Sequence, residues 1–165
     1  MHEFEEIIFL PDWLQKNKNI LADRFPKLSK YLVSKIDNIS TSEFALVVFE
    51  EYILIILITI SAVYFDFYNL WIGVFMAFYL HLIVHIIQWL VVRKYVPFII
   101  SSIICLPYCT YLLKILLTMK EIHYETLTFR TIIGIIVTLL NLIVVHHIAM
   151  LMTKKLLSTR PQFIF

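Results

Sequence analysis

The chain has 165 residues, of which 61% are hydrophobic, and its mean hydropathy is +0.85. Ordinary soluble domains have an apolar share of about 45–50%, so this composition excludes that class and indicates an integral membrane protein of one domain. The net charge of +2 is small and gives no sign of nucleic-acid binding, so we expect no nucleic-acid partner.

The first 42 residues are less apolar than the rest and are expected to stay at the membrane surface. Residues 1–10 predict at most a short helix that ends at Pro11-Asp12-Trp13 and is too short to span a bilayer. Residues 15–42 are polar and basic, and Pro26 is expected to begin a short surface helix that runs to about Ile36. Residues 1–42 are therefore predicted to form an N-terminal motif followed by an interfacial cytoplasmic segment.

Four apolar stretches follow, each long enough to cross a membrane as a helix. They cover residues 44–65, 70–92, 97–119 and 129–152. The predicted fold class is all-α: an integral membrane four-helix bundle with an amphipathic, interfacial N-terminal helical segment. In this scheme residues 43–156 form the four-helix transmembrane domain and residues 157–165 form a cytoplasmic tail.

The placement of lysine and arginine predicts the orientation. Most of these residues lie in the N-terminal segment, at Arg93-Lys94 and in the tail, which share one side of the membrane if there are four spans. The positive-inside rule then places both termini in the cytoplasm, and the expected location is the bacterial cytoplasmic membrane.

Ionisable side chains from three of the spans are predicted to lie at a similar depth. His81 and His85 are one helical turn apart on one face of the second span. With a rise of about 1.5 Å per residue, all of these side chains fall roughly 10–18 Å from the cytoplasmic helix ends. The residues of this layer are Glu50, Glu51, His81, His85, His146 and His147. A helix that carries His2, Glu5 and Glu6 begins on the same side and is able to fold in to meet them.

Imidazole and carboxylate groups gathered in an apolar layer point to a metal site for zinc or iron. The spacing of His81 and His85 is the one that helical zinc sites use. Nine residues are predicted as ligands, enough for one or two ions: His2, Glu5, Glu6, Glu50, Glu51, His81, His85, His146 and His147. Glu5 and Glu51 are the expected catalytic acid/base groups. Because adjacent helical residues point about 100° apart, one of Glu50/Glu51 and one of His146/His147 is expected to face inward.

The motif H-x-x-E-E occupies residues 2–6, and further elements follow it in order: Pro11…Trp13, Phe49-Glu50-Glu51, His81…His85 and Arg93…Tyr95-Val96-Pro97. This ordered set resembles the bacterial HXXEE-motif integral membrane protein family over most of the chain. The family is named for its motif and has no established reaction, so the resemblance implies a fold and a ligand set. Family members are expected to have an apolar helix before the motif, whereas here the motif begins at residue 2. Either a span precedes Met1 or the motif lies on an interfacial helix.

These features favour a membrane-embedded metal-dependent enzyme that acts on a lipid or other hydrophobic substrate near the cytoplasmic side. Hydrolysis is preferred over a di-iron type of redox chemistry. Two alternatives stay open: a proton or metal-ion carrier, and a non-catalytic interaction protein whose polar layer serves helix packing. The expected partners are the lipid bilayer, the hydrophobic substrate and further copies of the chain in a homo-oligomer.

Overall fold

The computed structural model describes residues 2–26, 41–119 and 124–159 of the chain. These residues form five helices and no strand, which confirms the all-α prediction. The helices are α1 His2–Arg24, α3 Thr41–Phe65, α4 Tyr68–Val92, α5 Ile99–Thr118 and α6 Tyr124–Thr159.

Helices α3, α4, α5 and α6 are long and apolar enough to cross a membrane, so the chain is an integral membrane protein. Their outward faces carry large apolar side chains, such as Ile56 on α3 and Ile143 on α6, which is 66% exposed. Exposed apolar surface on this scale suits contact with lipid rather than with water. Every spanning segment is helical, as a bilayer requires of a backbone without water partners.

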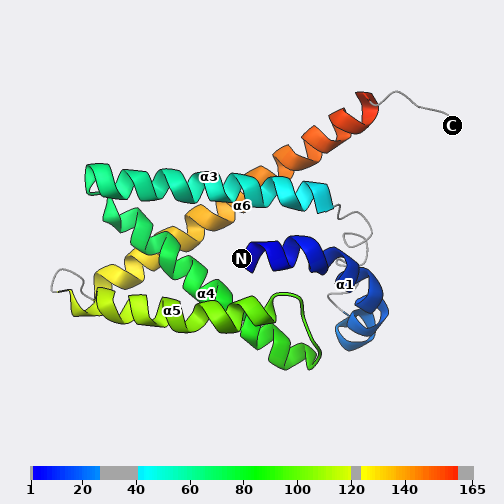
Figure 1. The fold of residues 1–165 in the computed structure, drawn as a ribbon, viewed down its shortest axis with the longest axis horizontal. Coiled ribbons are helices and arrows are strands. Elements are labelled where there is room, and N and C mark those ends of the chain that lie inside the picture. The colour runs from blue at the N-terminus through cyan, green and yellow to red at the C-terminus, as the bar shows by residue number, and fades with distance from the viewer. Residues whose placement is uncertain (1, 27–40, 120–123, 160–165) are drawn as a thin grey trace.

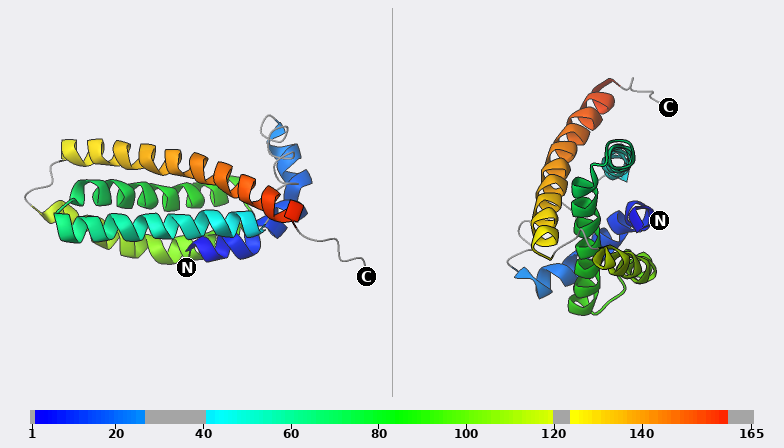
Figure 2. Two further views of the ribbon diagram at one scale, coloured as in Figure 1. Left: turned by 90° about the horizontal axis from the view of Figure 1, so that it is seen from above. Right: turned by 90° about the vertical axis from the view of Figure 1, so that its left-hand side faces the viewer.

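Helix α4 is the centre of the bundle, because it packs against α3, α5 and α6. Helix α3 also packs against α6. The remaining helix, α1, contacts α3 and α5. In the end view of Figure 2, the first part of α1 lies between α3 and α5, to one side of α4. This position brings side chains of α1 within reach of α4.

Helix α1 differs from the prediction, since it does not end at residues 11–13. It continues to Arg24 with Pro11 inside it. Proline removes one backbone hydrogen bond and crowds the carbonyl four residues earlier, which bends a helix more often than it ends one when both sides are held by packing. Figure 1 shows a first stretch alongside α3, with its N-terminal end near the middle of the bundle, and a later stretch that turns across the bundle end. The first stretch therefore packs against α3 and α5 as part of the bundle.

Helix boundaries deviate modestly from the predictions elsewhere. Helix α4 begins at Tyr68, inside the predicted turn, and Asp66 takes a left-handed backbone conformation with φ of 56°. Helix α6 extends beyond the predicted span at both ends. The predicted surface helix from Pro26 to about Ile36 lies, apart from Pro26, outside the described residues.

The α4–α6 contact depends on two glycines that face one another. A Cβ atom on Gly134 would collide with the carbonyl group of Gly73, and one on Gly73 would collide with the carbonyl oxygen of Arg130. Small residues at such a crossing let two helix backbones touch directly, which is how many membrane helices associate.

We predict that Gly134→Val separates α4 from α6 and destabilises the protein by about 1–3 kcal/mol, the usual range for an overpacked contact. The measurement is the midpoint of thermal unfolding in detergent. Ile143→Ala on the exposed face of α6 is the control and should leave the midpoint close to the wild-type value. Equal midpoints for all three proteins would show that the two glycines do not fix this crossing.

Candidate metal centre

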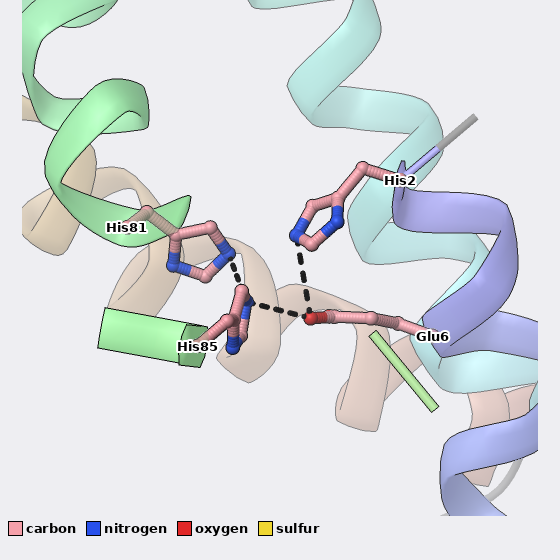
Figure 3. A group of neighbouring side chains, drawn as sticks. All are labelled: His2, Glu6, His81 and His85. Carbon is pink, nitrogen blue, oxygen red and sulfur yellow. Dashed lines mark hydrogen bonds and ion pairs between the residues drawn. The ribbon is translucent and has the colours of Figure 1, made fainter. Parts of the chain in front are cut away.

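Two helices bring four metal-ligating side chains together: His2 and Glu6 from α1, and His81 and His85 from α4 (Figure 3). One ligand atom from each lies within 4.8 Å of every other. His85 Nε2 is 2.7 Å from His81 Nε2 and 3.0 Å from Glu6 Oε1. His2 Nε2 is 3.8 Å from Glu6 Oε1. Three imidazole nitrogens and one carboxylate oxygen therefore surround a common point.

The local sequence explains why each helix presents its pair to the same place. His2 and Glu6 are four residues apart, as are His81 and His85, so each pair occupies one face of its helix. Leu82 and His85 are buried whereas His81 is exposed, so the α4 pair lies at the edge of the protein interior. The acidic residues Glu3 and Glu5 in the first turn of α1 suit the positive end of the helix dipole.

The hydrogen bonds of His2 fix which nitrogen is available as a ligand. Its Nδ1 is 2.8 Å from Ser101 Oγ, and the Ser101 hydroxyl donates its proton to Glu5 Oε2. A hydroxyl has one proton to give, so Ser101 Oγ accepts from His2 Nδ1–H. The lone pair of His2 is then on Nε2, which is buried and has no hydrogen-bond partner among the described residues.

Burial keeps His2 in the neutral form that a metal ligand requires. Its side chain is 3% exposed, and desolvation, followed by the charge of His85, lowers the pKa of His2 to about 4. An imidazole with this pKa is unprotonated on Nε2 at neutral pH. A buried, unpartnered and unprotonated nitrogen that faces three other ligand atoms is unusual for a packing histidine.

His85 is oriented in a similar way by a partner behind it. Its Nδ1 is 2.9 Å from Gln88 Oε1, which accepts the Nδ1–H proton and leaves Nε2 to face Glu6 and His81. The ring of Phe98 lies against it, with ring centroids 4.0 Å apart. Metal-binding histidines typically donate their second nitrogen to an oxygen in this manner.

The segment between α4 and α5 supplies these supporting groups. Arg93 takes a left-handed conformation that ends α4, and the residues 96–99 that follow are buried. This places the backbone N–H of Ser101 3.0 Å from Glu5 Oε2, and Tyr95 donates its hydroxyl proton to Glu5 Oε1 at 3.2 Å. Glu5 therefore ties α1 to the start of α5 and orients His2 through Ser101.

The geometry fits a single tetrahedral ion. A zinc–nitrogen bond of about 2.0–2.1 Å places the ligand atoms of a tetrahedral site about 3.3 Å apart. Three of the six separations between ligand atoms are 2.7 Å, 3.0 Å and 3.8 Å, and all six are within 4.8 Å, so small side-chain movements would bring the group to this value. Imidazole and carboxylate ligands suit zinc and iron(II) alike.

The other five predicted ligands lie outside this group. Glu5 has the role given above, and Glu50 accepts a hydrogen bond of 3.0 Å from the amide of Asn141 on α6. His146 and His147 are exposed, and His146 Nδ1 donates to the carbonyl oxygen of Leu142 at 3.1 Å. Glu51 faces two cavities beside the group. Of the adjacent pair on α3, Glu51 is thus the residue that reaches the centre's surroundings.

Two cavities adjoin the four ligands. The first cavity, about 320 Å³, has His2, Glu3 and Glu51 in its wall. The second cavity, about 240 Å³, has Glu6, His81 and Glu51 in its wall. Most of the other lining residues of both cavities are apolar. The candidate metal centre therefore opens onto apolar space.

Sequence reasoning missed Ser101 and Glu3. Ser101 is 99 residues from His2, and its place beside the imidazole follows from the turn before α5, for which the local sequence has no direct signal. Glu3 is one of the two variable positions of the H-x-x-E-E pattern. Burial, with Glu6 and Glu51 nearby, raises the pKa of Glu3 to about 7.

The sequence was compared with family models, curated proteins and solved structures, and a family model matches it. No curated protein and no solved structure matches the chain. A family model described as a protein of unknown function with HXXEE motif matches residues 1–112, a range that includes all four grouped ligands together with Ser101. The chain belongs to this HXXEE-motif family.

Proposed function

We propose that the protein is a membrane-embedded, metal-dependent hydrolase that acts on a lipid or other hydrophobic substrate near the cytoplasmic side. The observation that carries the proposal is the buried His2 Nε2, which faces Glu6, His81 and His85 without a hydrogen-bond partner among the described residues. Burying an unpaired polar atom is costly, and a metal ion bound there would remove that cost.

The ligand set favours one ion, zinc in preference to iron. The described residues contain one group of at least three metal-ligating side chains with this geometry. Di-iron bundles use more carboxylates, with two glutamate–histidine pairs and two further glutamates. Three histidines and one glutamate therefore support hydrolysis over the redox alternative.

In hydrolysis a bound metal would supply Lewis acidity and an acidified water. A water needs a coordination position of its own, so beside the four side chains of the group it would bind as a fifth ligand or in place of one of them. Water oxygen bonds to the substrate's carbonyl carbon, and the bond from that carbon to oxygen or nitrogen breaks. Glu51, which lines both cavities, would accept the proton from water and return it to the leaving oxygen or nitrogen. His2, Glu6, His81 and His85 would hold the ion, while Ser101 and Gln88 would keep two of the imidazoles in the ligating tautomer.

The cytoplasmic placement is supported by the basic end of α4. Arg93 and Lys94 follow the last residue of this helix, and His85 lies about 12 Å from Arg93 along the helix axis at 1.5 Å per residue. Cytoplasmic ends of spans are enriched in such residues. The proposed centre then lies in the cytoplasmic half of a bacterial cytoplasmic membrane, with both termini inside.

Elemental analysis of detergent-purified protein is the first test. We expect close to one zinc or iron per chain in the wild type, and a loss of most of it in His81→Ala/His85→Ala, because two of the four ligands are gone. The matched control is His146→Ala/His147→Ala, which removes two histidines outside the group and should retain the metal.

Absence of metal from wild type and both variants, with all three proteins equally well folded, would remove the enzyme proposal. It would leave a carrier or an interaction protein. Equal metal loss in both double variants would instead show that the centre extends to α6.

A second prediction concerns the support behind His2. Ser101→Ala should weaken metal binding by about 10–100-fold, the usual effect of removing a group that orients a ligand, while Ser101→Thr retains the hydroxyl and should restore most of the affinity. The measurement is competition with a chelator of known affinity. The control is Ser102→Ala. This adjacent serine is buried, and among the described hydrogen bonds its hydroxyl contacts only the Phe98 carbonyl. Identical affinities for the alanine and threonine variants would contradict this role.

Orientation is tested with reporters fused to the C-terminus. A reporter that is active only in the cytoplasm should give full signal, and one that requires export should give little, because basic flanks are retained inside. The reverse pattern would place the centre in the opposite half of the membrane.

A further inference from the structure

We infer that the substrate is an uncharged amphiphile with a single hydrocarbon chain. This chain occupies the first cavity as far as Trp71, and the reacting carbonyl lies between Glu3, Glu51 and the four ligands. The inference rests on the proposed function and specifies its substrate. It excludes phosphate esters, which a metal-dependent hydrolase could otherwise cleave.

The two cavities lie side by side and share one wall. Six residues line both: Glu3, Val48, Glu51, Ile55, Val74 and Phe78. The two carboxylates of this shared wall lie on α1 and α3, at the same end as His2 and His81, which line one cavity each. The polar end of the space is therefore the end that adjoins the metal centre.

The first cavity continues from this polar end into the bundle along two antiparallel helices. On α4 its lining residues run from Phe78 back to Trp71, and on α3 they run from Val48 to Ile58. The stretch on α3 is about 15 Å long at 1.5 Å per residue. The volume of about 320 Å³ falls within the usual range of small-molecule sites, about 300–1,000 Å³. An elongated apolar space with acidic side chains and the metal ligands at one end suits a hydrocarbon chain.

Trp71 marks the far end of this space. It lines both the first cavity and a third cavity of about 530 Å³ that extends to Met119 and Arg130. Its ring is stacked on Phe75, with centroids 5.7 Å apart and planes 3° from parallel. The indole thus separates the two cavities and would limit the length of a bound chain.

The charges around the polar end select the head group. Three carboxylates, from Glu3, Glu6 and Glu51, line the first two cavities. In the part of the chain that the structure describes, no lysine or arginine lines either one. A phosphate would find no cationic side chain there and would depend on the metal ion alone for its counter-charge, beside acidic side chains that repel it where they are ionised. An ester or amide without charge meets no such repulsion, whereas a phosphate does.

The test compares two probes that differ only by a phosphate: a monoacylglycerol with a brominated chain and the matching brominated lysophosphatidate. Bromine quenches tryptophan on contact, so the protein carries Trp13→Phe and Trp89→Phe, which leaves Trp71 as the reporter. Measurements are made in nanodiscs with the metal-binding residues intact, and again with His81→Ala/His85→Ala.

Saturable quenching of Trp71 by the monoacylglycerol is expected, with lysophosphatidate binding about tenfold or more weakly because of the repulsion. Val74→Phe fills the shared wall and should reduce monoacylglycerol binding about tenfold. Val84→Phe, the same change on a face of α4 that is 46% exposed, should bind as the parent protein does. Glu3→Gln/Glu51→Gln should raise the affinity for lysophosphatidate toward that for monoacylglycerol.

Equal quenching in the Val74→Phe and Val84→Phe proteins would overturn the inference, since it would mean that bulk lipid reaches Trp71. Equal binding of the two probes by the parent protein would overturn the charge selection. Saturable binding by a wild-type protein that elemental analysis shows to be free of metal would support the substrate site while the hydrolase proposal fails. Absence of saturable binding by a wild-type protein that does hold metal would overturn the inference alone, so the two failures are distinguishable.

Discussion

The contact between the Glu6 carboxylate and the His85 imidazole, 3.0 Å apart and buried on both sides, is the interaction on which this arrangement depends. It joins the first helix of the chain to the central helix at a depth where water is scarce. The two side chains form an ion pair only when His85 is protonated; with neutral His85, a metal ion bound between them would join them instead. Three features position Glu6 and His2 beside His85. They are the bend in α1, the hydrogen bonds between Glu5 and Ser101, and the buried turn before α5.

Much of this architecture can be predicted from the sequence because its signals are local. Four apolar stretches predict four spans, and the spacing of His81 and His85 places both on one helical face. The family resemblance directed attention to His2 and Glu6, which the structure brings to that face. Depth along the helices predicted one layer for residues of the first, second and fourth spans, and the helix that carries His2 and Glu6 was expected to begin on the same side.

The rest depends on rotation about helix axes and on tertiary contacts, which periodicity in a uniformly apolar helix does not reveal. Glu50 and Glu51 lie at one depth, yet one contacts Asn141 and the other faces the cavities. His146 and His147 share the predicted depth but are exposed. Pro11 was read as a helix end because local rules favour that interpretation, whereas packing of α1 between α3 and α5 keeps the helix continuous through it.

The place of α1 between α3 and α5 has a consequence for biosynthesis. Residues 2–10 leave the ribosome before the four spans, yet one wall of the space that they occupy, α5, is made about a hundred residues later. These residues must therefore wait outside the bundle until α5 is in place. In that order, the ligands on α4 reach the membrane before those on α1 join them, so a complete centre can form only in a chain whose first, second and third spans are already in place.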